Sequence, residues 1–189
     1  MKLVFATNNS NKLSEIRSLV PDGIEILSLK EINCNEELPE TNPTLKENAL
    51  QKARYVFDNY GFNCFADDTG LEIDALGGEP GVYSARYAGE DCSAEDNMKK
   101  VLDKLEGEKE KSANFRTVIA LIIDGKETLF EGECKGEITQ TKSGVEGFGY
   151  DPIFIPNGYQ LTFAEMNKVE KGAVSHRGKA IKRLVAFLY

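Results

Sequence analysis

The sequence predicts an α/β protein with a mixed central β-sheet flanked by helices. Near the start of the chain, short apolar strands alternate with amphipathic helices, which is typical of parallel strand pairing. Further along, the turn-forming pair Asp124–Gly125 joins two long strand-like segments, which is typical of an antiparallel hairpin. Both kinds of strand pairing are therefore expected in one sheet.

Each element is expected from apolar periodicity and from the residues that begin or end it. Thr44 and Glu47 are spaced as a helix capping box, and Gly61 suits the end of the same helix. Residues 113–123 are apolar on both faces, as expected of a central strand. In chain order, we expect a strand over 2–6, a turn over 7–11, a helix from about 12, a strand over 24–29, a loop over 33–43, a helix from 44 to 60, a strand over 62–66, a helix from 93 to about 107, strands over 113–123, 127–138 and 151–155, and a final helix from about 175.

The composition is that of a globular protein and argues against several classes of function. The 189 residues are 41% hydrophobic and 29% charged, which suits a single domain over residues 1–189. No apolar stretch approaches the ~20 residues that span a bilayer, and no signal sequence is evident, so we expect a cytoplasmic protein. With a net charge of −8, the chain is not expected to bind long nucleic acid or a membrane. The four cysteines are widely spaced, which indicates reduced structural thiols.

The turn between the first strand and the first helix is a candidate phosphate site. Backbone N–H groups at a helix N-terminus, with a lysine in the first turn, favour a phosphate group. An ordinary capped helix with a solvated lysine would give the same pattern, and the segment lacks the glycines of a P-loop. The candidate phosphate-binding residues are Thr7, Asn8, Asn9, Ser10, Asn11 and Lys12.

Two adjacent aspartates, Asp67 and Asp68, follow the strand expected over 62–66. Adjacent side chains on a strand point to opposite faces, so only one of them can face a given site. An aspartate that merely forms a turn would explain one carboxylate but not both. Mg²⁺ prefers one or two carboxylates together with substrate phosphates, and α/β folds place their sites at the C-terminal ends of strands. The acidic loop that contains Glu40 could supply a second metal ligand.

Two further segments could bind a base and an anion. Phe148 lies between two glycines, which would leave its ring free to stack on a base, although a glycine-rich turn with core aromatics would look the same. The only histidine, His176, precedes Arg177 at the expected start of the last helix, with Lys171 nearby. A lone histidine is more often structural, but this basic cluster favours an anion or a carbonyl acceptor. Phosphate donors, a carboxylate-bound metal and an aromatic platform together indicate a nucleoside triphosphate site.

Five segments carry a specific family resemblance: FATNNSNKLSEI, LPETNPTLKENA, FADDTGLEIDALGGEPGVYSARYAG, GFGYDPIF and TFAEMNKVEKGAVSHRGKA. They closely resemble the noncanonical purine nucleoside triphosphate pyrophosphatases, also called inosine or xanthosine triphosphate pyrophosphatases, in order and over nearly the whole chain. The resemblance implies a two-lobed mixed α/β fold with the active cleft between the lobes, and usually a homodimer. It also implies Mg²⁺-dependent hydrolysis of ITP, dITP, XTP and dXTP to the monophosphate and pyrophosphate.

The resemblance further implies a role for each candidate residue. Residues 7–12 would hold the triphosphate, Glu40 and Asp68 would hold Mg²⁺, and Asp68 would act as the general base. Many members of the family have glycine where this chain has Asn11, and asparagine also tolerates a left-handed turn. The base and the remaining phosphate contacts would come from Thr69, Phe148, Gly149, Tyr150, Asp151, Lys171, His176 and Arg177.

Two features of the sequence leave alternatives open. The same pocket would suit a metal-dependent phosphohydrolase that releases orthophosphate from another nucleotide, or a non-catalytic module that binds a nucleotide without turnover. The glycine-rich loop over residues 77–81 would let the backbone pack closely, either against the cleft or against a partner subunit.

Overall fold

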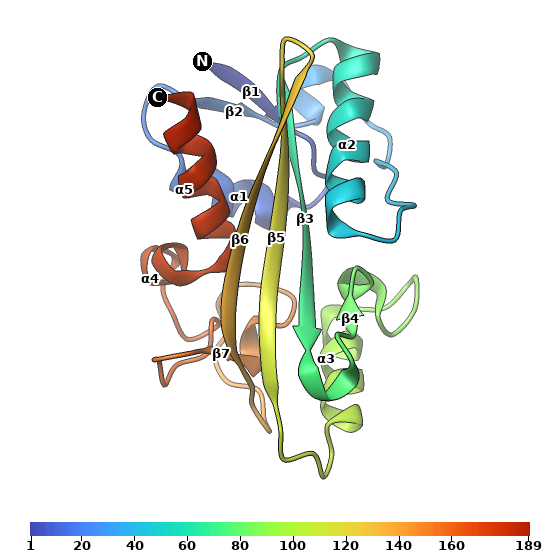
Figure 1. The fold of residues 1–189 in the computed structure, drawn as a ribbon, viewed down its shortest axis with the longest axis vertical. Helices are drawn as coiled ribbons and strands as arrows, with labels where there is room; N and C mark the ends of the chain where they lie inside the picture. Colours follow the sequence, from blue (N-terminus) through green and yellow to red (C-terminus); the bar gives the residue numbers. More distant parts are fainter. The chain divides into compact units, whose positions relative to one another are not determined.

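The computed structural model describes residues 1–189 and confirms the mixed α/β class (Figure 1). The strands are β1 (Lys2–Phe5), β2 (Glu25–Leu27), β3 (Cys64–Ile73), β4 (Pro80–Gly81), β5 (Ser112–Ile123), β6 (Lys126–Ile138) and β7 (Phe154–Pro156). The α-helices are α1 (Ser10–Leu19), α2 (Leu45–Tyr60), α3 (Ala94–Lys104), α4 (Lys168–Val174) and α5 (His176–Leu188). Short 3-10 turns are η1 (Lys30–Ile32), η2 (Asp74–Leu76), η3 (Ser84–Arg86) and η4 (Asp151–Ile153). None of the helices has the length and apolar character needed to cross a membrane.

The chain divides into two compact units, each with its own hydrophobic core. The first unit comprises Met1–Asp68, Thr117–Gly132 and Gly178–Tyr189, and the second comprises Thr69–Arg116 and Glu133–Arg177. Strands β3, β5 and β6 each contribute residues to both units. The expectation of an active cleft between two lobes stays a prediction.

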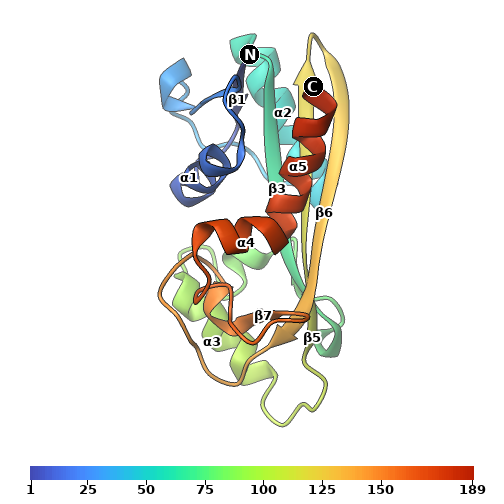
Figure 2. The ribbon, with the colours of Figure 1, turned by 90° about the vertical axis from the view of Figure 1, so that its left-hand side faces the viewer.

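In the first unit, helices cover both faces of the sheet. Strand β1 pairs in parallel with β2 and with β3, as the alternation of strands and helices predicted. Helices α1 and α5 bury apolar side chains such as Ile16 and Leu184 against Phe5 and Phe65 of the sheet. Helix α2 covers the opposite face, where the Cys64 thiol donates a hydrogen bond to the carbonyl of Ala53 (Figure 2). Side chains of β1 and of the first-unit part of β3 therefore face helices on both sides of the sheet.

In the second unit, the sheet becomes antiparallel at both edges. Strand β4 pairs with β3, and β7 pairs with β6. The core beneath this part of the sheet combines Leu71 of β3 and Phe115 of β5 with Val101 of α3, Phe154 of β7 and Phe163. Phe163, from the segment between β7 and α4, is thereby packed against the sheet.

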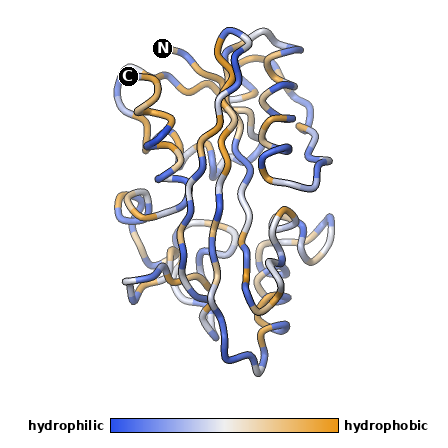
Figure 3. The backbone as a smooth tube through the Cα atoms, viewed as in Figure 1, coloured by the Kyte–Doolittle hydropathy of each residue, from blue (hydrophilic) through white to orange (hydrophobic).

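Strand β5 shows how the two units differ in the covering of the sheet. Residues 117–122 of β5, in the first unit, are buried at every position, whereas exposure alternates over residues 112–116 in the second unit. The same contrast is visible along β5 in the colouring of Figure 3. A continuous apolar run correctly predicted a strand covered on both faces, but only for the part of β5 that lies in the first unit.

Two element boundaries differ from the prediction. Strand β3 does not end before the paired aspartates but continues through them to Ile73, because both carboxylates find lysine partners. Helix α1 begins at Ser10 rather than near Lys12, because the side chain of Asn9 accepts hydrogen bonds from two backbone N–H groups and caps the helix earlier. Asn11 therefore lies within the helix and does not adopt the left-handed conformation considered for it.

Two further segments near the end of the chain were predicted incorrectly. The region expected to be a strand over 151–155 begins as the turn η4 and becomes extended only in β7. The structure also has helix α4 over Lys168–Val174, where the sequence analysis expected no helix. Its seven residues are too few for a clear apolar period, and it is fixed by a capping box between Asn167 and Glu170. The last helix, expected from about residue 175, begins at His176.

The glycine-rich loop packs against strand β3 of its own unit. Gly81 pairs with Leu71, and a side chain at Gly70 would place its Cβ 2.6 Å from the carbonyl oxygen of Gly81. Gly77, Gly78 and Gly81 have positive φ angles, which explains why glycine is needed in this turn. The sequence suggested a close approach of this backbone to the cleft or to a partner, whereas here the close neighbour is β3.

Candidate active site

The two adjacent aspartates on β3 contact different lysines. The Lys12 Nζ atom of helix α1 donates a hydrogen bond of 3.0 Å to Asp67 Oδ1. Asp68 Oδ1 lies 3.9 Å from the Nζ atom of Lys52, on helix α2. Because α1 and α2 cover opposite faces of the sheet, the alternation expected for neighbouring strand residues is preserved. Both aspartates are buried, so their charges depend on these partners.

Lys52 is a central residue of this site that sequence analysis missed. Lys52 is 4% exposed, donates a 2.7 Å hydrogen bond to the carbonyl of Asp67, and forms ion pairs with Glu40 and Asp68. A signal was present: Lys52 falls one residue before Ala53 on the buried face of α2, where apolar residues recur. A lysine at a buried helix position needs a charged partner, and the paired aspartates supply it.

The charges of this group shift the pKa values of its members. Burial alone would lower the pKa of Lys52, but the carboxylates of Asp68 and Glu40 outweigh it and the pKa is raised. Burial raises the pKa of Asp68, with Lys52 and Lys12 opposing it and the charges of Glu40 and Asp67 adding to it. Lys52 is thus firmly cationic, whereas Asp68 holds a proton more readily than an ordinary aspartate.

The predicted metal ligands, Glu40 and Asp68, are brought together by Lys52. No group of three or more histidine, cysteine or acidic side chains in the chain could hold a metal ion by itself. Two carboxylates that leave the other positions to water and substrate phosphates are what Mg²⁺ usually takes. The donor set therefore fits an ion that binds together with a nucleotide.

The first motif uses several of its polar groups within the protein. Asn9 Oδ1 accepts hydrogen bonds from the backbone N–H groups of Asn11 and Lys12, at 2.9 and 3.1 Å. Thr7 Oγ1 accepts one from the backbone N–H of Asn9. The amide of Asn8 donates to the carbonyl of Glu36 and accepts from the backbone N–H of Leu38. Ser10 is exposed at the start of the helix, and the Lys12 ammonium group lies beside Asp67.

In the second unit, Asp151 organises a group of cationic and aromatic side chains. Its Oδ2 atom accepts hydrogen bonds from the backbone N–H of Phe148, at 2.8 Å, and from Lys171 Nζ, at 2.7 Å. The Lys171 Nζ atom lies 5.0 Å from the Phe148 ring centre, and the Arg177 guanidinium carbon lies 5.4 Å from it. Arg177, only 1% exposed, also donates to Thr69 Oγ1 at 3.2 Å. The structure therefore brings these five predicted residues together.

The remaining predicted residues of this unit are mostly tied into its core. The Tyr150 phenol is buried and donates a 2.7 Å hydrogen bond to the carbonyl of Ser84. The His176 ring stacks on Phe115, with ring centres 4.5 Å apart. Gly149 has a positive φ and forms part of the turn. Gly147 was not predicted as a site residue, yet a Cβ there would lie 2.1 Å from Asp151 Oδ2.

Comparisons with known proteins identify the family to which this chain belongs. The sequence pattern of the Ham1 family matches residues 3–187. The dITP/XTP pyrophosphatase of Flavobacterium johnsoniae is 57% identical over 100% of this chain and 98% of its own length, and that of Porphyromonas gingivalis is 52% identical over 99% and 97%. The solved structure of the Staphylococcus aureus Ham1 protein has a TM-score of 0.88 and 40% identity, covering 100% of this chain and 98% of that chain. A HAM1 protein from Coxiella burnetii has a TM-score of 0.90 and 39% identity, with the same coverage. The chain therefore belongs to the Ham1 family.

Proposed function

We propose that this protein hydrolyses the noncanonical purine nucleoside triphosphates ITP, dITP, XTP and dXTP to the nucleoside monophosphate and pyrophosphate. The observation that carries the proposal is the buried group in which Lys52 holds the carboxylates of Glu40 and Asp68. Full-length relatives that are 52% to 57% identical are named dITP/XTP pyrophosphatases, which supports the same assignment. Such an enzyme would remove deaminated purines from the nucleotide pool.

The chemistry assigned to the first unit rests on its charges. Glu40 and Asp68 would hold Mg²⁺, which when bound neutralises charge that develops on the phosphate oxygens. Lys12 and Lys52 add positive charge for the triphosphate, and the N-terminus of α1 is favourable for an anion. Asp68 would orient the water that attacks the α-phosphorus and accept its proton. Its raised pKa moves its proton affinity towards that of an effective general base.

Selection of the base is assigned to the second unit. Hypoxanthine and xanthine present an acceptor at O6, whereas adenine presents an amine donor at the same position. Arg177 is buried beside Phe148 and has no acceptor atoms, so it would pair with O6 but not with the adenine amine. Phe148 would stack on the base, and Asp151 would keep Lys171 beside it. A buried donor that faces another donor stays unsatisfied, which can discriminate by ~10⁴.

The decisive experiment measures pyrophosphate and orthophosphate release from ITP, XTP, dITP, ATP and GTP, with Mg²⁺ and with a chelator. We expect Mg²⁺-dependent release of pyrophosphate from the deaminated nucleotides, with ATP and GTP nearly untouched. Orthophosphate release would indicate a phosphohydrolase of a different type. Binding of ITP without turnover in saturating Mg²⁺ would indicate a nucleotide-binding module.

The assembly and location of the enzyme are further parts of the proposal. The family resemblance supports a homodimer, which light scattering on the purified protein would detect as twice the chain mass of 20.9 kDa. The excess of acidic over basic residues, 31 against 23, supports a protein that does not bind long nucleic acid. A substrate from the nucleotide pool supports a cytoplasmic location, which fractionation of the source cells would test.

A further inference from the structure

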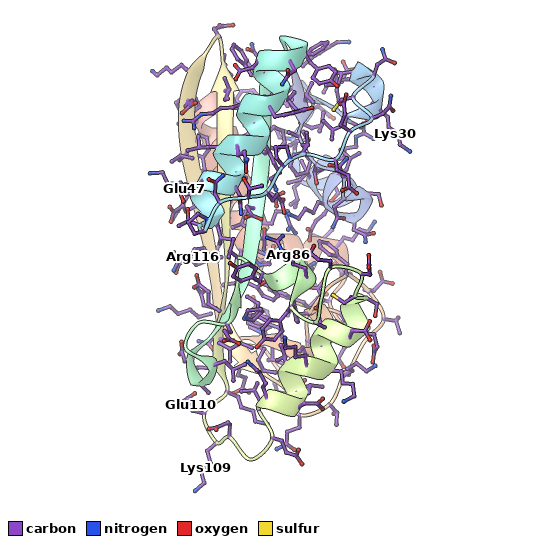
Figure 4. All side chains as sticks on the ribbon, turned by 90° about the vertical axis from the view of Figure 1, so that its right-hand side faces the viewer. Lys30, Glu47, Arg86, Lys109, Glu110 and Arg116 are labelled. Carbon is purple, nitrogen blue, oxygen red and sulfur yellow. The ribbon has the colours of Figure 1, made fainter.

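The segment that carries Glu40 has no regular structure of its own. Residues 34–44 lie between η1 and α2 and form neither helix nor strand. Figure 4 shows the chain passing from η1, near the labelled Lys30, to the first turn of α2, where Glu47 is labelled. On one side of the segment a hollow of about 560 Å³ is lined by Pro39, Asn42 and residues of α2. Pro39 and Asn42 therefore border open space on that side.

Three amide side chains hold the segment on both sides of Glu40. Before Glu40, the Asn8 amide bonds to the carbonyl of Glu36 and to the backbone N–H of Leu38, both at 3.1 Å. After Glu40, two residues of α2 hold the backbone N–H groups of the next two residues. Gln51 Oε1 accepts from the Thr41 N–H at 3.0 Å, and Asn48 Oδ1 accepts from the Asn42 N–H at 2.8 Å.

Gln51 makes the largest number of these bonds. Besides the Thr41 N–H, its Oε1 atom accepts from the Asn42 side chain at 2.8 Å, and its Nε2 atom donates to Thr41 Oγ1 at 2.9 Å. Gln51 is the residue immediately before Lys52, which binds the Glu40 carboxylate. One turn of α2 thus fixes both the backbone beside Glu40 and the cation that its carboxylate meets.

We propose that Asn8, Asn48 and Gln51 form an amide clamp, and that Gln51 is the positioning residue that places the Glu40 carboxylate. The clamp offsets the conformational entropy that is lost when an irregular segment is ordered. It also gives Asn8 a structural task. The consequence for catalysis rests on the proposed function, whereas the clamp itself does not.

The test compares Gln51→Leu, which keeps the size of the side chain but removes its polar atoms, with Asn59→Leu on the same helix. Asn59 is exposed and bonds only to the carbonyl of Tyr55, so it serves as the matched control. Amide hydrogen exchange of the nucleotide-free protein is measured over residues 36–44. We expect exchange at Thr41 and Asn42 to accelerate at least about tenfold in Gln51→Leu and to stay unchanged in the control. Gln51→Glu, which retains the acceptor oxygens, should restore the protection.

The second readout is the Mg²⁺ concentration that gives half-maximal ITP hydrolysis. Loss of a residue that orients a metal ligand typically weakens metal affinity 10–100-fold, so we expect Gln51→Leu to raise this midpoint at least about tenfold. The KM for ITP at saturating Mg²⁺ should change little. Unchanged exchange at Thr41 and Asn42 would overturn the clamp, and faster exchange with an unchanged Mg²⁺ midpoint would overturn the positioning of Glu40. If the unmodified protein does not hydrolyse ITP, the proposed function fails, while the exchange data still decide the clamp.

Discussion

At the scale of single residues, the site depends on charges that are buried in pairs. Lys12 lies beside Asp67, and Lys52 lies beside Asp68 and Glu40. Two neighbouring carboxylates repel each other, and the positive charge of each lysine offsets this repulsion. The balance is incomplete at Asp68, whose pKa stays raised by its burial. Ionisation of Asp68 therefore costs stability in the folded protein, as is often the case for functional residues.

Replacing Asp68 by asparagine should separate stability from activity. A carboxyl group whose pKa is raised in the folded state is less favourable as an anion there than in the unfolded chain. We therefore expect Asp68→Asn to be more stable than the unmodified protein at pH 8. This gain should shrink as the pH falls through the raised pKa and level off below 3.8, the ordinary value. Urea denaturation at pH 8, 6 and 4.5, in the presence of a chelator, measures the gain.

The same variant should lose turnover by about 10²–10⁴-fold, the usual contribution of a general base. Asp67→Asn is the matched comparison, because it removes the neighbouring carboxylate and leaves Asp68 in place. Retained activity in Asp68→Asn, with loss in Asp67→Asn, would transfer the chemistry to Asp67.

Arg177 offers a test of base selection at a single side chain. Arg177→Met keeps a long side chain beside Phe148 but removes every hydrogen-bond donor. We expect the ratio of kcat/KM for ITP to that for ATP to fall by roughly 10²-fold, since the donor no longer distinguishes O6 from an amine. Lys168→Met, at an exposed basic residue of α4, is the control and should leave the ratio unchanged. An unchanged ratio in Arg177→Met would contradict this account of selectivity.

The sequence predicted the acidic residues of this site, but it did not predict the lysine that pairs with them. Asp67 and Asp68 were conspicuous because adjacent carboxylates need an explanation. Lys52 was missed because a lysine between Gln51 and Ala53 on an amphipathic helix is ordinarily a boundary residue whose ammonium group reaches water. Only the three-dimensional approach of α2 to β3 shows that its ammonium group is buried among carboxylates.

At the scale of elements, the close approach of β4 to β3 depends on two glycines. A methyl group at Gly70 would lie 2.6 Å from the carbonyl oxygen and 2.9 Å from the carbonyl carbon of Gly81. Neither atom can move without shifting the backbone of β4. The pairing of β4 also leads into η3, where Ser84 Oγ accepts a hydrogen bond from the backbone N–H of Leu71.

We expect Gly70→Ala to lower the free energy of unfolding by about 1–3 kcal/mol, the usual cost of overpacking. The exchange of the Leu71 N–H should accelerate, because β4 and η3 must move away from β3. Gly61→Ala is the comparison: it strains a left-handed backbone, with φ of 69°, but meets no atom within 4 Å. It should lower stability without changing the exchange of Leu71, as hydrogen exchange of both variants would show. Normal exchange in Gly70→Ala would mean that β4 tolerates the added methyl group.

The elements that the sequence predicted best are those with recognisable capping or turn residues at their ends. Helix α2 has Thr44 at its start and Gly61 in a left-handed conformation at its end, and both were recognised. The hairpin turn at Asp124 and Gly125 has positive φ at both residues, as its sequence predicted. Strand β3 was predicted too short because charge normally ends a buried strand, and the lysines that permit Asp67 and Asp68 lie far away in sequence.

At the scale of the whole molecule, two cores share three strands. One core contains Phe65 and Ile119, and the other contains Phe115 and Phe154. Strands β3, β5 and β6 pass from one unit to the other without a break. When the core of one unit unfolds, the part of each shared strand in that unit is no longer held in place. The part of the same strand in the other unit then loses neighbouring strand-pairing hydrogen bonds. Cooperative unfolding is therefore expected even though the chain has two compact units.

The cysteines provide a probe for each unit. Cys64 lies in the first unit, is fully buried, and has a pKa raised by burial to about 12, so it should not react while the unit is folded. Cys134 lies in the second unit and is 4% exposed. Brief thiol labelling at each urea concentration, followed by peptide mass spectrometry, reports the unfolding of the two units separately.

We expect Cys64 and Cys134 to become reactive at the same urea concentration. Leu105→Ala, which opens a cavity in the second core, should cost about 2–5 kcal/mol and move both midpoints to lower urea by the same amount. The shift at Cys64 is the informative result, because Leu105 belongs to the other unit and its loss can reach Cys64 only if the units unfold together. A shift confined to Cys134 would show that the second unit unfolds alone, and that continuity of the strands does not by itself couple the two cores.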